Sequence, residues 1–281
     1  MLFEDYHVHT EFSEDSYCQM QDQITQAIKN GIQEICITDH VDYGVKLDWD
    51  EPEKIVFRDD GCPVANVNYP VYFTKLDYMR KLHGDKIIIK NGLEFGMQTH
   101  TIGQFQKLFD RYEDRLDFII LSLHQINDQE FWMQAFQKGK TQQQYNEEYY
   151  QELYEIMKVY KDYSILGHLD VINRYDLLGC YPFEKTKDIV AEILKLAIKD
   201  GKGIEVNTSS FRYGLPDLQP CRKILHLYKD LGGRILTIGS DAHYPNYVGA
   251  HIPEVMDILR DEIGFTEICT FDGMVPSFHK L

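Results

Sequence analysis

The sequence lacks the features that mark secreted and membrane-spanning proteins. Its six cysteines are scattered and form no Cys-x-x-Cys pair, so free thiols in a reducing compartment explain them more simply than disulfides do. The chain opens on MLFEDYHVHT, without the basic and apolar segments of a secretory leader. Its longest apolar runs, such as FIIL at 118–121, are far too short to cross a bilayer. We therefore expect a cytoplasmic protein that does not enter a membrane.

Positive charge is also scarce. The chain carries 29 Lys and Arg against 45 Asp and Glu, which gives a formal net charge of -16. No run of Lys or Arg would form the basic patch that a duplex nucleic acid or an anionic membrane surface requires. An anionic small substrate stays compatible with this charge if a bound metal supplies a local positive centre.

The chain does contain a regular alternation of short apolar segments and longer amphipathic ones. Gly or Asn marks several of the expected helix ends. Such an alternation indicates a parallel sheet, and about seven units without a break indicate a closed (β/α) barrel in one domain, residues 1–281. The expected strands are 3–9, 34–39, 86–94, 117–123, 163–168, 203–208 and 234–240, and the expected helices are 17–30, 70–84, 101–113, 142–161, 184–200, 217–231 and 253–263.

Two segments stand apart from this alternation. The longest irregular stretch, 41–69, contains scattered Asp, Gly and Pro, and a loop of this length in a compact domain is usually functional. We expect it to be a lid or a specificity loop. The Tyr-rich segment 147–160 is expected to be an amphipathic helix that packs on the barrel, with a dimer contact as the alternative, so the chain is a monomer or a homodimer.

Polar residues with the chemistry of metal ligands end every expected strand. In the first strand, DYHVH, alternate residues face the same side, so we expect Asp5, His7 and His9 to face inward while Tyr6 and Val8 face the helices. In parallel barrels the carboxyl ends of the strands meet at one rim, where active sites are built. The later strands end on Asp39 and His40, on Glu94, on His124, on His168 and Asp170, on Glu205 and Asn207, and on Asp241 and His243.

The residue types indicate which metals this rim would bind. Imidazole nitrogens and carboxylate oxygens suit Zn, Mn and Fe, and the absence of cysteine at these positions argues against a structural zinc-thiolate site. About nine side chains with ligand chemistry exceed the needs of a single ion. A group of two or three divalent ions bridged by a carboxylate fits that number.

The ordered motifs resemble the PHP (polymerase and histidinol phosphatase) superfamily, and within it the monofunctional histidinol-phosphate phosphatases. The matching pieces are DYHVHTEFSED, ITDH, GLEFG, the strand-end His124, GHLD, NTSSFR and GSDAH, and the final GFTEICTFDGMVPSFHKL also resembles the family's ending. This resemblance implies a distorted, TIM-like (β/α)7 barrel with a trinuclear metal centre. It implies one ion at His7, His9, Glu94 and Asp241, a second that shares Glu94 with His124 and His168, and a third at Asp15, His40 and His243.

The resemblance also implies an activity, the metal-dependent hydrolysis of a phosphate monoester, L-histidinol phosphate, in histidine biosynthesis. A positioned guanidinium usually neutralises the charge on phosphoryl oxygens, so Arg174 and then Arg212 are the candidates for binding phosphate. Asp241 and His243 are candidates for protonating the leaving group. Residues expected to support the ligands from behind are Asp5, Asp39, Asp170, Glu205 and Asn207, and Asp42, Tyr43, Asp48, Trp49 and Phe211 are available to contact the organic part of the substrate.

Other readings of the sequence lead elsewhere. KGKT at 138–141 has Gln134 where a phosphate-binding loop needs glycine, and Ser240 lacks the G-x-S-x-G elbow of a nucleophile. Alternative functions are another PHP phosphoesterase, acting on sugar phosphates, phosphotyrosine or nucleic acid, and a metal-binding barrel without catalytic activity. The histidines read as non-ligands are His83, His100, His226, His251 and His279.

Overall fold

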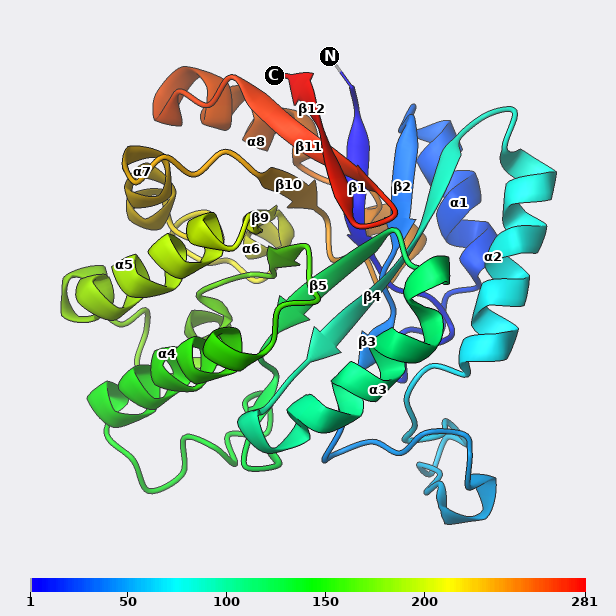
Figure 1. The fold of residues 1–281 in the computed structure, drawn as a ribbon, viewed down its shortest axis with the longest axis horizontal. Helices are drawn as coiled ribbons and strands as arrows, with labels where there is room; N and C mark the ends of the chain where they lie inside the picture. Colours follow the sequence, from blue (N-terminus) through cyan, green and yellow to red (C-terminus); the bar gives the residue numbers. More distant parts are fainter. Residues whose placement is uncertain (1) are drawn as a thin grey trace.

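The computed structural model describes residues 2–281 and shows an α/β barrel (Figure 1). Seven parallel strands follow one another around the sheet in chain order. The first strand also meets the last, because Val8 bridges Ala242 and the Asp241 N–H donates to the His7 carbonyl at 2.8 Å. The barrel is therefore nearly closed, which confirms the predicted fold class. Its strands are β1 (Glu4–Val8), β2 (Glu34–Ile37), β4 (Ile88–Gly96), β5 (Phe118–Ser122), β8 (Ile165–Leu166), β9 (Gly203–Asn207) and β10 (Leu236–Gly239), with the short β3 (His40–Val41) beside the end of β4.

Helices cover the outside of the barrel (Figure 1). Each predicted helix is present, although several helices begin or end a few residues away from the predicted positions. The helix expected from 217 begins only at Arg222, because the Asp217 carboxylate accepts the Arg222 N–H at 3.0 Å and so satisfies a donor at the helix start. The helices are α1 (Met20–Lys29), α2 (Tyr69–His83), α3 (Ile102–Tyr112), α4 (Gln142–Val159), α5 (Phe183–Lys199), the short α6 (Ser209–Arg212), α7 (Arg222–Asp230) and α8 (Ile252–Ile258), which continues as a π-helical turn, Leu259–Ile263.

Short elements connect the main ones at both ends of the barrel. A small hairpin of β6 (Gln125–Ile126) and β7 (Gln129–Glu130) follows the end of β5. The remaining turns are 3-10 helices, namely η1 (Pro52–Lys54), η2 (Thr99–Thr101), η3 (Glu113–Arg115), η4 (Val171–Tyr175) and η5 (Pro245–Tyr247). Within residues 2–281, no helix combines the length and the apolar character needed to cross a membrane.

The amino-terminal end of the barrel is closed by an apolar floor. The hairpin of β11 (Glu267–Asp272) and β12 (Val275–Lys280) lies across the beginnings of the strands (Figure 1). Its Phe271 packs on Phe118, with ring centroids 5.0 Å apart, and the Phe271 N–H donates to the Tyr6 hydroxyl at 2.7 Å. The cluster that forms this floor consists of Tyr6, Cys36, Phe118, Ile120, Ile165, Cys269 and Phe271.

The position of Tyr6 in this floor corrects the prediction for strand β1. A bulge interrupts the pairing of β1 with β2 between Asp5 and Val8, and a bulge breaks the strict alternation of inward and outward side chains. Tyr6 and His7 therefore both lie inside the barrel. Val8, in contrast, belongs to the apolar cluster between the strands and the surrounding helices. The Asp5 carboxylate instead accepts backbone N–H groups of Ser240 and Gly249, each at 2.8 Å, and so ties β1 to the end of β10.

The floor generates a prediction about stability. Phe118 is fully buried, and replacing a buried phenylalanine with alanine removes apolar contact and leaves a cavity. We expect Phe118→Ala to lower the free energy of unfolding, measured by urea denaturation, by about 3–5 kcal/mol. The matched control is Phe278→Ala in β12, whose ring is 41% exposed and which should cost less than about 1 kcal/mol. Equal losses in the two variants would contradict this account of the floor.

Candidate metal centre

A single buried carboxylate, that of Glu94, lies at the centre of the polar rim. Its Oε2 lies 3.1 Å from His7 Nε2 and 3.0 Å from His40 Nδ1. Its Oε1 lies 3.2 Å from His124 Nε2 and 2.9 Å from His168 Nε2. Glu94 comes from the carboxyl end of β4, and the four histidines come from β1, β3 and the segments that follow β5 and β8. Side chains from five separate strand ends thus meet around one carboxylate.

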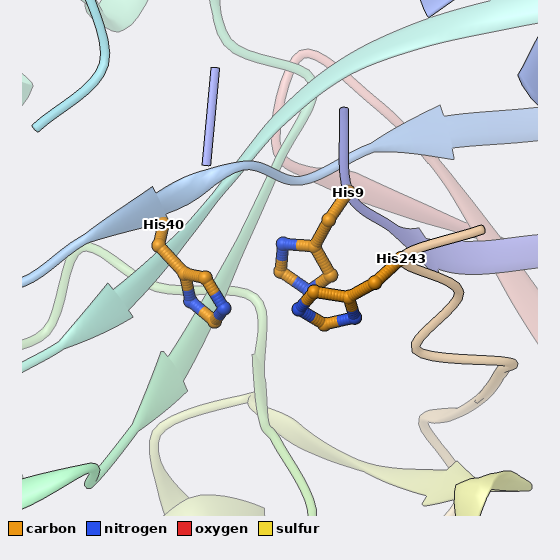
Figure 2. A group of neighbouring side chains, drawn as sticks. All are labelled: His9, His40 and His243. Carbon is orange, nitrogen blue, oxygen red and sulfur yellow. The ribbon is translucent and has the colours of Figure 1, made fainter. Parts of the chain in front are cut away.

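Two further carboxylates extend this cluster toward solvent. Asp241 Oδ1 lies 3.4 Å from His9 Nε2 and 3.6 Å from His243 Nδ1. Asp15 Oδ2 lies 3.6 Å from His40 Nε2 and 3.1 Å from His243 Nε2. The rings of His9, His40 and His243 lie close together (Figure 2), with the His9 centroid 4.1 Å from that of His40 and 4.2 Å from that of His243.

The geometry and the hydrogen bonding of this cluster fit bound metal ions. Two ligand atoms held about 2.0–2.2 Å from a tetrahedral ion are about 3.4 Å apart, close to the spacings found here. Within this cluster, buried atoms that lie close to one another without a hydrogen-bond partner among residues 2–281 include His7 Nε2, His9 Nε2, His40 Nδ1 and Glu94 Oε2. Metal coordination would satisfy them. Sets of three ligand atoms that could share an ion are His9, His40 and His243; His7, Glu94 and His168; His7, His9 and Asp241; and His40, Glu94 and His124.

Proximity of opposite charges shifts the protonation equilibria of the cluster. Burial alone would raise the pKa of Glu94, but His7, His124 and His40 hold that pKa well below its usual range. Burial would lower the pKa of His7, but Glu205, Glu94 and Asp241 raise it well above its usual value. The same competition raises the pKa of His124 to about 9, through Glu94 and Asp42. Ionised carboxylates therefore keep protons on His7 and His124 when no metal is bound, whereas burial lowers the pKa of His9 and of His168.

A second ring of hydrogen bonds orients the imidazoles. His7 Nδ1 donates to Glu205 Oε1 at 2.6 Å. The other oxygen of Glu205 accepts a hydrogen bond from the backbone N–H of His168 at 2.9 Å. Asn207 donates to Glu205 at 3.1 Å. A carboxylate on the far nitrogen fixes the tautomer of a metal-binding histidine and raises its basicity. The structure thus places Glu205 and Asn207 behind the cluster, in contact with His7 and His168.

Two residues in this outer ring were not predicted there. His124 Nδ1 donates to Asp42 Oδ1 at 2.8 Å, so Asp42, which the sequence offered as a substrate contact, holds a histidine instead. Ser13 accepts from His9 Nδ1 at 3.2 Å and donates to Asp39 at 2.6 Å, so Asp39 acts on an imidazole only through that hydroxyl. Asp42 follows the end of β3, two residues after His40, and this spacing was the signal that could have identified it.

Other predicted residues have different partners in the structure. The Asp170 carboxylate accepts the Cys221 N–H at 3.0 Å, at the start of α7, and contacts no imidazole in the described chain. This corrects its predicted role. Phe211 stacks on His251 with a centroid distance of 4.2 Å. Trp49 donates to the Asn66 carbonyl, and Tyr43, Asp48 and Tyr69 are joined by hydrogen bonds, so these side chains do not line the cavity described next.

A cavity of about 450 Å³ opens over the cluster. Both predicted arginines line it. Arg174 donates to Asp241 Oδ2 at 3.2 Å, to Ser209 Oγ at 2.7 Å and to Gln219 Oε1 at 2.8 Å. Arg212 donates to the carbonyl of Asp241 at 2.8 Å and lies over the ring of Tyr247. Two guanidinium groups are therefore held beside the candidate metal ligands, with donors to spare for an anion.

The contact between Asp42 and His124 requires a glycine at position 96. A Cβ atom on Gly96 would lie 1.8 Å from Asp42 Oδ1 and 2.6 Å from His124 Nδ1. We expect Gly96→Ala to displace His124 and to lower the metal content of the purified protein, measured by plasma mass spectrometry, by about one ion per chain. Gly103→Ala is the control, because nothing lies within 4 Å of that position. Unchanged metal content in Gly96→Ala would contradict the assigned role of the pair.

The raised histidine pKa values predict that metal binding displaces protons. Imidazole binds a metal only in its neutral form, yet the raised pKa values of His7, His40 and His124 keep these rings protonated near pH 7 in the metal-free protein. The apparent affinity should therefore rise as pH rises, about tenfold per pH unit for each proton displaced. Calorimetric titration of the metal-free protein with zinc, in buffers of different ionisation enthalpy, measures that release. Heats independent of the buffer would refute it.

Comparison with known proteins places the chain in a family. The model of the PHP domain family matches residues 5–209. A histidinol-phosphatase from Lactococcus lactis is 30% identical, with 96% of this chain and 94% of that protein aligned, and a "probable histidinol-phosphatase" from Thermotoga maritima is 29% identical, with 91% of each aligned. The crystal structure of the histidinol phosphate phosphatase from Lactococcus lactis, in complex with zinc, L-histidinol and phosphate, is similar with a TM-score of 0.82 at 29% identity, covering 99% of this chain and 100% of that one. The chain therefore belongs to the PHP domain family.

Proposed function

We propose that this protein is a metal-dependent phosphomonoesterase that hydrolyses L-histidinol phosphate to L-histidinol and phosphate in histidine biosynthesis. The observation that carries the proposal is the Glu94-centred cluster at the base of a cavity that also holds Arg174 and Arg212. Support for the substrate comes from the relatives, which are named histidinol-phosphatases, and from the related structure with zinc, L-histidinol and phosphate.

The cofactors of this reaction would be two or three divalent ions, Zn, Mn or Fe. His7, His9, Glu94 and Asp241 would hold one ion; Glu94, His124 and His168 would hold a second; Asp15, His40 and His243 would hold a third. When bound, such ions supply a water of lowered pKa and stabilise charge on phosphoryl oxygens. The division of the two Glu94 oxygens between different histidines supports its use as a bridge.

The remaining roles belong to the protein's own side chains. Arg174 and Arg212 would bind the phosphate, since charge-assisted hydrogen bonds to phosphoryl oxygens are the strong kind. Asp241 keeps Arg174 aimed at the cavity through their ion pair. Glu205 and Asp42 fix the tautomers of His7 and His124, so that the nitrogens facing the cavity stay available as ligands.

We further propose that the chain acts as one domain, in the cytoplasm, as a monomer or homodimer, and without a nucleic-acid partner. Segment 41–69 would serve as a lid. Three of its contacts with the rest of the site support this: Asp42 bonds His124, Lys46 lies 3.6 Å from Glu14, and Arg58 donates to the Glu14 carbonyl at 2.6 Å. The lid thus touches the loop that carries Asp15.

Phosphate release by the metal-loaded protein tests the proposed function. We expect turnover of L-histidinol phosphate with a kcat/KM at least about a hundredfold above that for a sugar phosphate, a phosphotyrosine peptide or single-stranded DNA. Glu94→Gln should lower both turnover and metal content, because the Glu94 carboxylate lies within 3.5 Å of five histidines that would hold ions. Glu113→Gln is a surface change before the start of β5, at the end of the strand away from His124, and it should alter neither turnover nor metal content.

Two results would contradict the proposal. Equal weak activity on all four substrates would favour a broader phosphoesterase of the same family. No activity on any substrate, with metals fully loaded, would favour a metal-binding barrel without catalytic function.

A further inference from the structure

The carboxylates that line the cavity differ in whether a positively charged or hydrogen-bonding side chain already pairs with them. They are Glu14, Asp15, Asp42, Glu130 and Asp241. Lys46 lies 2.8 Å from Asp42 and 3.6 Å from Glu14. Asp15 faces His40 and His243, and Asp241 faces Arg174. Only the Glu130 side chain makes neither a hydrogen bond nor an ion pair within the part of the chain that the structure describes.

The backbone fixes Glu130 beside the metal-binding residues. In the hairpin of β6 and β7, Glu130 pairs with Gln125, the residue that follows His124. The next residue, Phe131, donates its N–H to the His124 carbonyl at 3.1 Å. Directly opposed residues of an antiparallel pair place their side chains on the same face, and Gln125, like Glu130, lines the cavity. The Glu130 carboxylate therefore lies on the cavity wall, opposite the residue that follows His124.

An aromatic side chain continues this wall outward. Trp132 lines the same cavity and is 60% exposed. A large exposed ring and an unpaired carboxylate in one cavity suit a flat, positively charged organic group, through contact with the ring and charge pairing with the carboxylate. The two arginines of the cavity suit the opposite charge. The cavity thus has groups for both ends of a molecule that carries a phosphate and an amine.

We propose that Glu130 binds the ammonium group of the substrate and selects phosphate esters of amino alcohols over esters without an amine. The proposal rests on the proposed function, since it assigns the organic end of the same substrate. Each of the other four carboxylates would have to give up an existing partner to bind an ammonium group, and separating a buried charge from its partner is costly. Glu130 loses only water when it binds.

The test compares two substrates in the metal-loaded holoenzyme. One is L-histidinol phosphate, and the other is imidazolylpropyl phosphate, which lacks only the amine. We expect Glu130→Gln to lower kcat/KM for the first about tenfold or more, mainly through KM, as loss of a hydrogen bond to a charged group does. The value for the amine-free ester should change less than about twofold, so the ratio between the two substrates falls. Glu130→Lys should lower the ratio further, because it places like charges together.

Glu113→Gln is the matched control, because it removes the same charge at an exposed site next to the start of β5. It should leave both kinetic constants and their ratio unchanged. Metal content and the circular dichroism spectrum of the Glu130 variants should match those of the parent protein. If Glu130→Gln keeps the parent ratio, or slows both esters equally, the assignment of Glu130 is wrong while the proposed function stands. If the parent protein does not hydrolyse L-histidinol phosphate at all, both are wrong.

Discussion

The structure depends on the attraction between one buried carboxylate and the imidazoles around it. Glu94 is fully buried, and burying an unpaired charge costs several kcal/mol or more in free energy. Its two oxygens instead lie within 3.2 Å of nitrogens from His7, His40, His124 and His168. Since those histidines come from different strand ends, the barrel must close for the carboxylate to be compensated. The function of the rim and the closure of the sheet are therefore coupled.

The barrel separates this polar rim from an apolar floor. Below Glu94, position 92 of β4 holds glycine, where a Cβ atom would approach the Cys36 sulfur to 2.7 Å. Beneath that level, Phe118, Tyr6 and Phe271 fill the interior and the terminal hairpin covers them. The floor shields the cluster from water on one side and leaves the cavity as its approach. Charges in such a site interact more strongly than they would in bulk water.

The periodicity of the sequence was sufficient to predict the fold and many of the rim residues, because both depend on patterns between residues that are close in the sequence. Strands that end on His or a carboxylate converge in a parallel barrel. The structure brings His7, His9, His40, Glu94, His124, His168, Asp241 and His243 close enough to form sets of three possible ligands. The departures arise from contacts between distant segments. The bulge that turns Tyr6 inward is stabilised by Phe271, 265 residues away, and the partner of Asp42 is His124, 82 residues away. That the Glu130 side chain has no partner becomes clear only when the partners of the other carboxylates in the cavity are known.

The central claim is that the two oxygens of Glu94 serve different ions. Anomalous diffraction at the zinc absorption edge, from crystals of the zinc-loaded protein, measures this most directly. We expect separate anomalous peaks, one within coordinating distance of Glu94 Oε2 and the His7 ring and another within coordinating distance of Glu94 Oε1 and the His124 ring. A single peak, or peaks that leave Glu94 uncoordinated, would contradict the account.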